Sequence, residues 1–110
     1  MQKSDEIKTR PYGGGVSELF CPRCGEANLH HSGVTVYDCG EDARTVVKTS
    51  VMGGKVTVDP EAPNSSENPS SRRHGLVIDF WCEGCGEQPI QLCVAQHKGS
   101  TELGWRFEPI

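Results

Sequence analysis

The stretch CPRCG at residues 21–25 has a counterpart of the same form, CEGCG, at residues 82–86. In each stretch two cysteines flank two residues and a glycine follows, so the turn brings both sulfurs to one side while backbone amides point toward them. Two such turns supply four thiolates, the ligand set of a tetrahedral structural Zn²⁺ site with bonds of about 2.3 Å. The sequence therefore predicts one shared site with Zn²⁺ as a structural cofactor. Its predicted ligands are Cys21, Cys24, Cys82 and Cys85.

The composition favours a metal over disulfides. A chain of 110 residues suits one domain, and a content of 35% apolar and 6% aromatic residues leaves a small core that needs a staple. We find neither a secretory signal nor a run of about 18 apolar residues, so we expect a cytoplasmic protein without a membrane span. In that reducing compartment paired cysteines indicate metal binding before disulfides. The net charge of −4 argues against broad attraction to nucleic acid or anionic lipid.

Alternation of apolar and polar residues predicts a mainly β fold with a small antiparallel sheet. Residues 16–20 form a short strand before the first cysteine pair, and residues 28–38 place Val34 and Val36 on one face and Thr35 and Tyr37 on the other. Three later strands each group apolar side chains on one face: Leu76, Ile78 and Phe80; Ile90, Leu92 and Val94, which we expect to point inward; and Leu103, Trp105 and Phe107. No segment has helical spacing over ten or more residues, so we expect no helix.

The two cysteine pairs are far apart, with 57 residues between Cys24 and Cys82. Compact two-turn sites have about 15 to 20 residues there. Residues 39–75 therefore read as an insertion, which contains a β-hairpin at residues 46–58 that turns at Gly53 and Gly54. Because the entropy of loop closure grows only logarithmically with length, such an insertion can leave the two pairs adjacent.

The remaining segments set the domain organisation. Residues 59–75 contain three prolines, four serines and no large apolar residue. We expect this segment to be a mobile loop, and deletion of residues 61–73 to change stability little. Residues 1–15 are polar and end in three glycines, so we expect a flexible N-terminal arm. Residues 16–110 then form a single domain.

Residues 16–38 and 76–107 resemble the zinc ribbon fold group, in which two cysteine turns lie at one end of an antiparallel sheet. The resemblance rests on CPRCG and CEGCG, each preceded by a strand. It extends to small zinc-ribbon proteins of bacterial and phage genomes that carry no assigned activity. Zinc ribbons bind nucleic acid or proteins, or act as structural staples, so the resemblance implies a metal and a fold without choosing a partner.

Other chemistries of these cysteines stay open. A rubredoxin-like electron carrier would hold iron in the same geometry, although only Phe20, Phe80 and Trp81 lie near the ligands in sequence. A redox pair of the thioredoxin type would lie between a strand and a helix, and neither cysteine pair of this sequence does. Four thiolates leave no open position for water or substrate, and the sequence has no catalytic constellation, so we expect no enzyme.

Cys39 and Cys93 remain outside this set. The simplest interpretation is free thiols, with Cys93 half-buried in a strand. The alternative is a second metal site that also uses His30, His31 or His97.

Two partner hypotheses follow. The first is a non-enzymatic module that binds a protein through its sheet or its inserted hairpin. The second is a nucleic-acid-binding zinc ribbon whose basic residues contact phosphate beside an exposed aromatic ring. The candidate contacts are Arg72, Arg73, Lys48 and Lys55, with Tyr37 or Trp81 as the ring.

Overall fold

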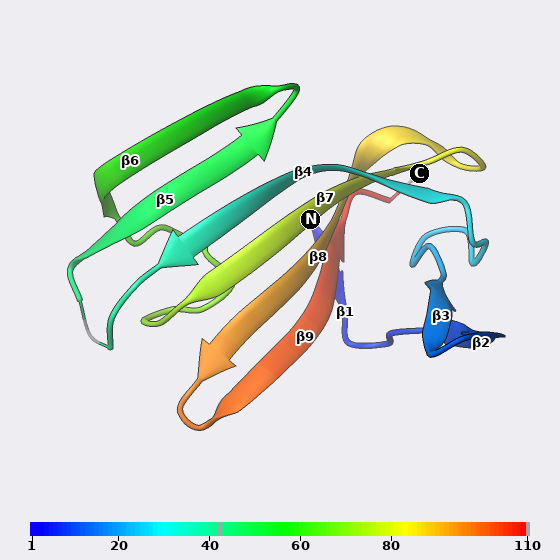
Figure 1. Ribbon diagram of the computed structural model, residues 1–110, viewed down its shortest axis with the longest axis horizontal. Helices are drawn as coiled ribbons and strands as arrows, with labels where there is room; N and C mark the ends of the chain where they lie inside the picture. The colour runs from blue at the N-terminus through cyan, green and yellow to red at the C-terminus, as the bar shows by residue number, and fades with distance from the viewer. Residues whose placement is uncertain (42, 110) are drawn as a thin grey trace.

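The computed structural model describes residues 1–41 and 43–109, and these form two antiparallel sheets (Figure 1). The strands are β1 (Gln2–Ser4), β2 (Thr9–Gly13), β3 (Val16–Leu19), β4 (Leu29–Asp38), β5 (Thr45–Met52), β6 (Lys55–Pro63), β7 (Gly75–Cys82), β8 (Gly86–His97) and β9 (Ser100–Phe107). The large sheet has seven strands in the order β1-β9-β8-β7-β4-β5-β6, and β2 pairs with β3. The mainly β fold class is confirmed. The described residues contain no helix with the length and apolarity needed to cross a bilayer.

The inserted hairpin lies at one edge of the large sheet. β5 and β6 turn at Gly53 and Gly54, whose φ angles of 59° and 78° lie in the left-handed region that favours glycine, so the predicted hairpin is confirmed. β5 pairs with the outer side of β4, while β4 stays paired with β7 from Leu29 opposite Cys82 to Tyr37 opposite Gly75. The long insertion therefore widens the sheet without separating the two cysteine turns.

The first fifteen residues form strands, contrary to the predicted flexible arm. β1 pairs with β9, with Lys3 opposite Arg106, and so forms one edge of the large sheet. β2 folds back on β3 around a turn of glycines with positive φ. The polar composition misled the prediction because both strands expose most of their side chains and are held through backbone pairing. Ile7, between them, packs against a buried cluster.

Residues 59–75 are ordered by polar contacts, contrary to the predicted mobile loop. β6 takes up the start of this segment, and the loop that follows buries Asn68 and Ser70. The Asn68 side chain donates to the Arg73 carbonyl (3.1 Å) and accepts from the Ser70 amide (3.0 Å). The Ser70 hydroxyl donates to the Gln96 carbonyl of β8 (2.9 Å), which fixes the loop to the sheet. Hydrogen bonds rather than apolar contacts order this loop, so its lack of large apolar residues did not indicate that it would be mobile.

Two buried clusters lie on opposite faces of the large sheet. The loop-side core consists of Tyr37, Cys39, Val46, Ala62, Val77 and Cys93. The cysteine-side core consists of Cys21, Cys82, Ile90, Trp105 and Phe107. The inward assignment in β8 is therefore only partly right: Ile90 is fully buried, whereas Leu92 and Val94 are half-buried and Cys93 is buried on the opposite face. Both faces carry buried side chains because the chain covers a different part of each.

Candidate metal centre

Strand pairing brings the two cysteine turns together. β3 leads into the first turn and β4 leaves it, while β7 ends at Cys82 in the second turn and β8 leaves it. Because β4 pairs with β7, Leu29 lies opposite Cys82, and the turns meet at one end of the sheet. The Gly25 amide closes the first turn on the Cys21 carbonyl (2.9 Å). Gly25 and Gly86 have φ angles of 80° and 104°, where a residue with a side chain would be strained.

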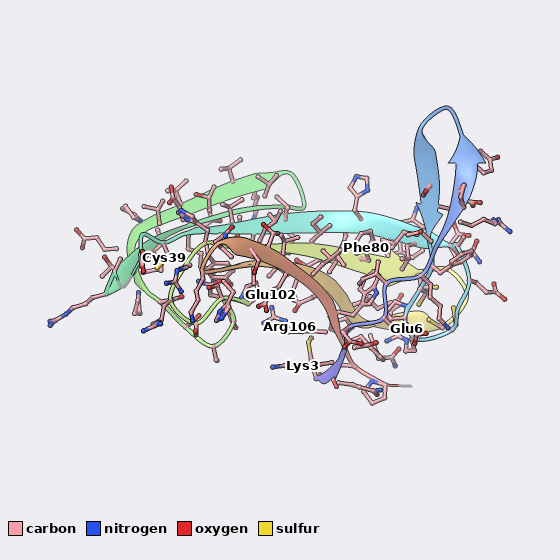
Figure 2. The ribbon with its side chains drawn as sticks, turned by 90° about the horizontal axis from the view of Figure 1, so that it is seen from below. Lys3, Glu6, Cys39, Phe80, Glu102 and Arg106 are labelled. Atoms are coloured by element: carbon pink, nitrogen blue, oxygen red, sulfur yellow. The ribbon has the colours of Figure 1, made fainter. Side chains whose placement is uncertain are left out.

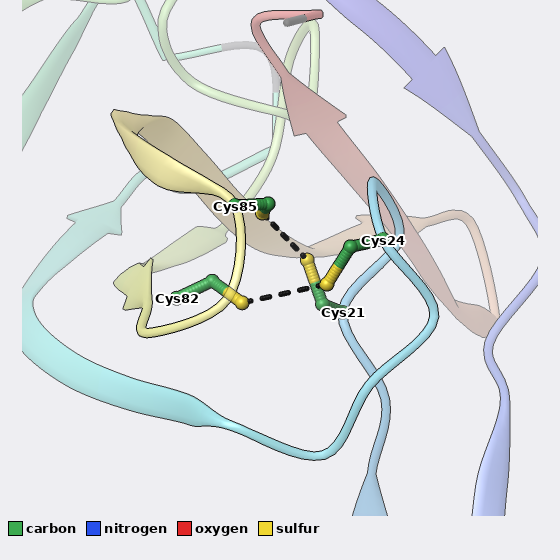
Figure 3. Close-up of side chains that lie close together, drawn as sticks. All are labelled: Cys21, Cys24, Cys82 and Cys85. Atoms are coloured by element: carbon green, nitrogen blue, oxygen red, sulfur yellow. Dashed lines mark hydrogen bonds between the residues drawn. The ribbon is translucent and has the colours of Figure 1, made fainter.

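The four predicted ligands converge on one point (Figure 3). All four Sγ atoms lie within 4.8 Å of one another. The Cys21 and Cys85 sulfurs are 3.7 Å apart, and those of Cys24 and Cys82 are 3.6 Å apart. A regular tetrahedron with metal–sulfur bonds of about 2.3 Å places its sulfurs about 3.8 Å apart. A disulfide needs sulfurs about 2.05 Å apart, so these are free thiols arranged as metal ligands.

The surroundings of the ligands differ. Cys21 and Cys82 are buried, whereas Cys24 is exposed and Cys85 half-buried. Burial raises the pKa of Cys21, Cys24 and Cys82, although backbone amides that point at these sulfurs lower it in part. Burial also acts to raise the pKa of Cys85, but hydrogen bonds from Arg23 and the other cysteines outweigh it, and the pKa is lowered. The metal-free site therefore holds mostly protonated thiols at neutral pH.

This protonation predicts that metal affinity rises with pH. A metal binds thiolates, so binding must release the protons that the raised pKa values of Cys21, Cys24 and Cys82 retain. Each released proton makes the apparent Kd about tenfold weaker for every pH unit of acidification. Competition with a chelator of known affinity between pH 6 and pH 8 measures this slope. An affinity independent of pH would contradict binding by these thiols.

Arg23 joins the two turns, a role that the sequence reading did not assign. Its Nε donates to the Cys85 sulfur (3.2 Å), and its terminal nitrogens donate to the carbonyls of Glu108 (2.7 Å) and Gln88 (3.3 Å). One side chain from the first turn thus contacts a ligand of the second turn and the chain that follows it. The only signal in the sequence was a cation between two cysteines, and its acceptors lie 62 to 85 residues away.

Replacing Arg23 with lysine is expected to weaken metal binding about 10- to 100-fold, the usual cost of losing a partner that orients a metal ligand. Lysine keeps the charge, but its single nitrogen cannot reach a thiolate and two carbonyls in the fork geometry of a guanidinium. Arg10→Lys is the matched control, because Arg10 is an exposed cation whose guanidinium bonds to Glu18 rather than to a cysteine. Chelator competition on both variants measures the effect, and equal affinities would contradict this role.

An aromatic core lies behind the two buried ligands. Trp105 is 1% exposed and packs edge-on against Phe80 with ring centroids 5.9 Å apart. Both rings belong to or pack against the cysteine-side core, together with Phe107. Proximity in sequence suggested Phe20, Phe80 and Trp81 as neighbours of the site, but β9 adds Trp105 and Phe107 from the end of the chain. Ligand and core positions are therefore interdependent.

The predicted partner contacts do not form one surface. Tyr37 is 4% exposed in the loop-side core, so its assignment as an exposed stacking ring is wrong. Trp81 is 43% exposed and stacks on His30, with ring centroids 4.3 Å apart. The Arg73 guanidinium is mostly buried and paired with Glu41 (2.8 Å). Arg72 and Arg73 precede β7, whereas Trp81 lies at its other end, so β7 separates the basic residues from the exposed ring.

Cys39 and Cys93 lie in the loop-side core, away from the four ligands. Both are free and buried, and burial raises the pKa of each thiol. Within residues 1–41 and 43–109 the four-cysteine group is the only cluster of potential metal ligands. These observations favour buried free thiols over a second metal site.

Comparison with known proteins adds no relative to this picture. No protein-family model, no curated protein and no solved structure matches the chain. The function must therefore be argued from the site and the sheet themselves.

Proposed function

We propose that this protein is a non-enzymatic interaction module of the zinc-ribbon type, held together by one structural Zn²⁺. The observation that carries the proposal is the convergence of four sulfurs within 4.8 Å of one another, with two of the separations, 3.6 and 3.7 Å, close to the tetrahedral value. Cys21, Cys24, Cys82 and Cys85 fill all four positions of such an ion, which leaves none for a substrate or a reactive water. The ion supplies structure, and the surrounding sheet supplies the binding surface.

Zinc is the metal that we assign to the site. Tetrahedral sulfur sites take zinc or iron, and at a given site Zn²⁺ binds more tightly than Fe²⁺. Elemental analysis of purified protein should give about one zinc per chain, and the protein should be colourless. A red protein with visible absorption and bound iron would instead support a rubredoxin-like electron carrier.

The recognition of a protein partner is the second part of the proposal. The exposed apolar side chains of the large sheet support it, because apolar patches of this kind mark interaction surfaces. The six free cysteines fit a reducing compartment such as the cytoplasm. Nucleic-acid binding has less support, since the basic residues do not gather beside an exposed ring. Raised salt should leave binding to a protein through this sheet largely intact, whereas phosphate contacts would lose affinity steeply.

A further inference from the structure

Two rows of directly paired residues cross six strands on one face of the large sheet. The first row runs from β9 to β6 through Leu103, Val94, Leu76, Val36, Thr49 and Val58. The second row follows the same strands through Trp105, Leu92, Ile78, Val34, Val51 and Val56. Residues paired in this way point to the same side of a sheet. We call this side the open face.

The open face is apolar at all but one position of its two rows. Thr49 is the one polar member, and neither row contains a charged residue. The charged residues of the same strand segments point to the opposite side: Lys48, Lys55, Asp59, Asp79, Glu102 and Arg106. Figure 2 shows the sheet nearly edge-on, with Lys3, Glu102 and Arg106 below it. Along the two rows the two sides of the sheet therefore differ in charge, and Asp38, two residues beyond Val36, lies on the open side.

The chain covers only part of this face. At the cysteine end Ile7, Leu19 and Leu29 pack against the core that contains Trp105. Farther from the metal centre five side chains of the two rows are exposed, from 41% for Val36 to 68% for Val56, and the others there are half-buried. An antiparallel sheet normally turns its apolar side to a core and its polar side to water. Here a valine-rich side faces water, which indicates a surface that another sheet covers.

We infer that the open face packs against the open face of a second copy of this chain, a deduction that rests on the proposed role in protein recognition. The uncharged rows offer no groups to a charged partner, but they match a second copy of themselves in polarity. Two apolar sheet faces pack about 10 Å apart with their strands nearly aligned. The charged residues within the rows point away from this contact, and Asp38, which lies beside the first row, is paired with His74 (3.2 Å), so the net charge of −4 opposes the contact little.

The size of the face agrees with a small, weakly associating interface. Six strands about 4.8 Å apart, with four residues of about 3.3 Å along each, span roughly 25 by 13 Å, so two such faces present roughly 650 Å² in projection. Trp105 within this span is already buried, which places the contact at the small end of specific interfaces. We therefore expect a Kd on the order of micromolar.

The edges of the sheet favour a closed dimer over a growing fibre. β6 carries Pro60 and Pro63, which cannot donate to a neighbouring strand, and β1 has only three residues. Strand addition at either edge is thereby disfavoured, so association is left to the face. A contact of one face with the same face has two-fold symmetry and closes after two copies.

Sedimentation equilibrium of the zinc-loaded protein across about 1 to 500 µM tests the inference. The chain should approach twice its monomer mass, and Val51→Glu or Val56→Glu should raise the dimer Kd at least about 100-fold, because the dimer would bury two unpaired charges. Thr57→Glu is the matched control, since Thr57 follows Val56 in β6 but points to the opposite side. This control should dimerise like the unmodified chain.

Two results would overturn the inference: a monomer at every concentration, or equal loss of association in the Val56 and Thr57 variants. The zinc content of the same samples separates this inference from the proposed metal site. A monomer with one zinc per chain would contradict the dimer and leave the metal site intact. A dimer without bound metal, dissociated by Val51→Glu, would support the dimer and contradict the metal site.

Discussion

Chelating the metal, or replacing Cys82 with serine, is expected to abolish the cooperative β-sheet fold. Cys21 and Cys82 are both proposed metal ligands and members of the cysteine-side core, so loss of the ion would release the two turns and that core together. Structural Zn²⁺ contributes about 10 to 16 kcal/mol in zinc-finger peptides. The total stability of an ordinary domain is about 5 to 15 kcal/mol. Far-ultraviolet circular dichroism during chelation and zinc addition measures the loss and its reversal.

Cys93→Ala provides the matched control for this experiment. Cys93 is as free and nearly as buried as Cys82, but it lies in the loop-side core away from the ligands. Its loss removes one small buried side chain and should cost about 1 kcal/mol without changing the metal content. A metal-free chain that keeps its sheet spectrum and its melting temperature would show that the two cores suffice without the ion.

The sequence predicted those parts of the fold that leave a side-chain pattern. Alternating apolar residues located the strands, and Gly53 with Gly54 located the hairpin turn. The pairing of β1 with β9 left no such pattern. Both strands there are joined by backbone hydrogen bonds, and the exposed polar side chains of β1 do not indicate such bonds. Alternation also cannot say which side of a strand is covered: Tyr37 is buried and Val36 exposed because the loop covers the less apolar side.

The candidate site also has a part that the sequence predicted and a part that it did not. The spacing of the cysteines predicted the four sulfurs that the structure brings together, because each turn is local and its chemistry depends on residue type alone. Arg23 and Trp105 could not be assigned, because their contacts with the site come from strands that meet only after folding. The long-range contacts of a site depend on strand order, and the sequence did not specify that order.

The second large effect is expected from Asn68→Ala, in the segment whose removal the sequence suggested would be harmless. Asn68 is 4% exposed, and its side chain bonds to Asn64, to the Arg73 carbonyl and to the Ser70 amide. Truncation leaves buried polar groups without partners, at about 1 to 3 kcal/mol each. We expect a total loss of about 3 kcal/mol and a melting temperature lower by about 10 to 15 °C, measured by thermal denaturation of the zinc-loaded protein.

Ser66→Ala, an exposed position in the same loop, should leave the melting temperature within about 2 °C. The effect of Asn68 should arise in the loop-side core, because a side chain added at Gly75 would approach the Asn68 oxygen to 2.0 Å, so this part of the loop lies directly on β7. Metal affinity should stay unchanged, since the four ligands lie at the other end of that strand. Equal stability of the two variants would show that the loop is a passive connection, as its composition suggested.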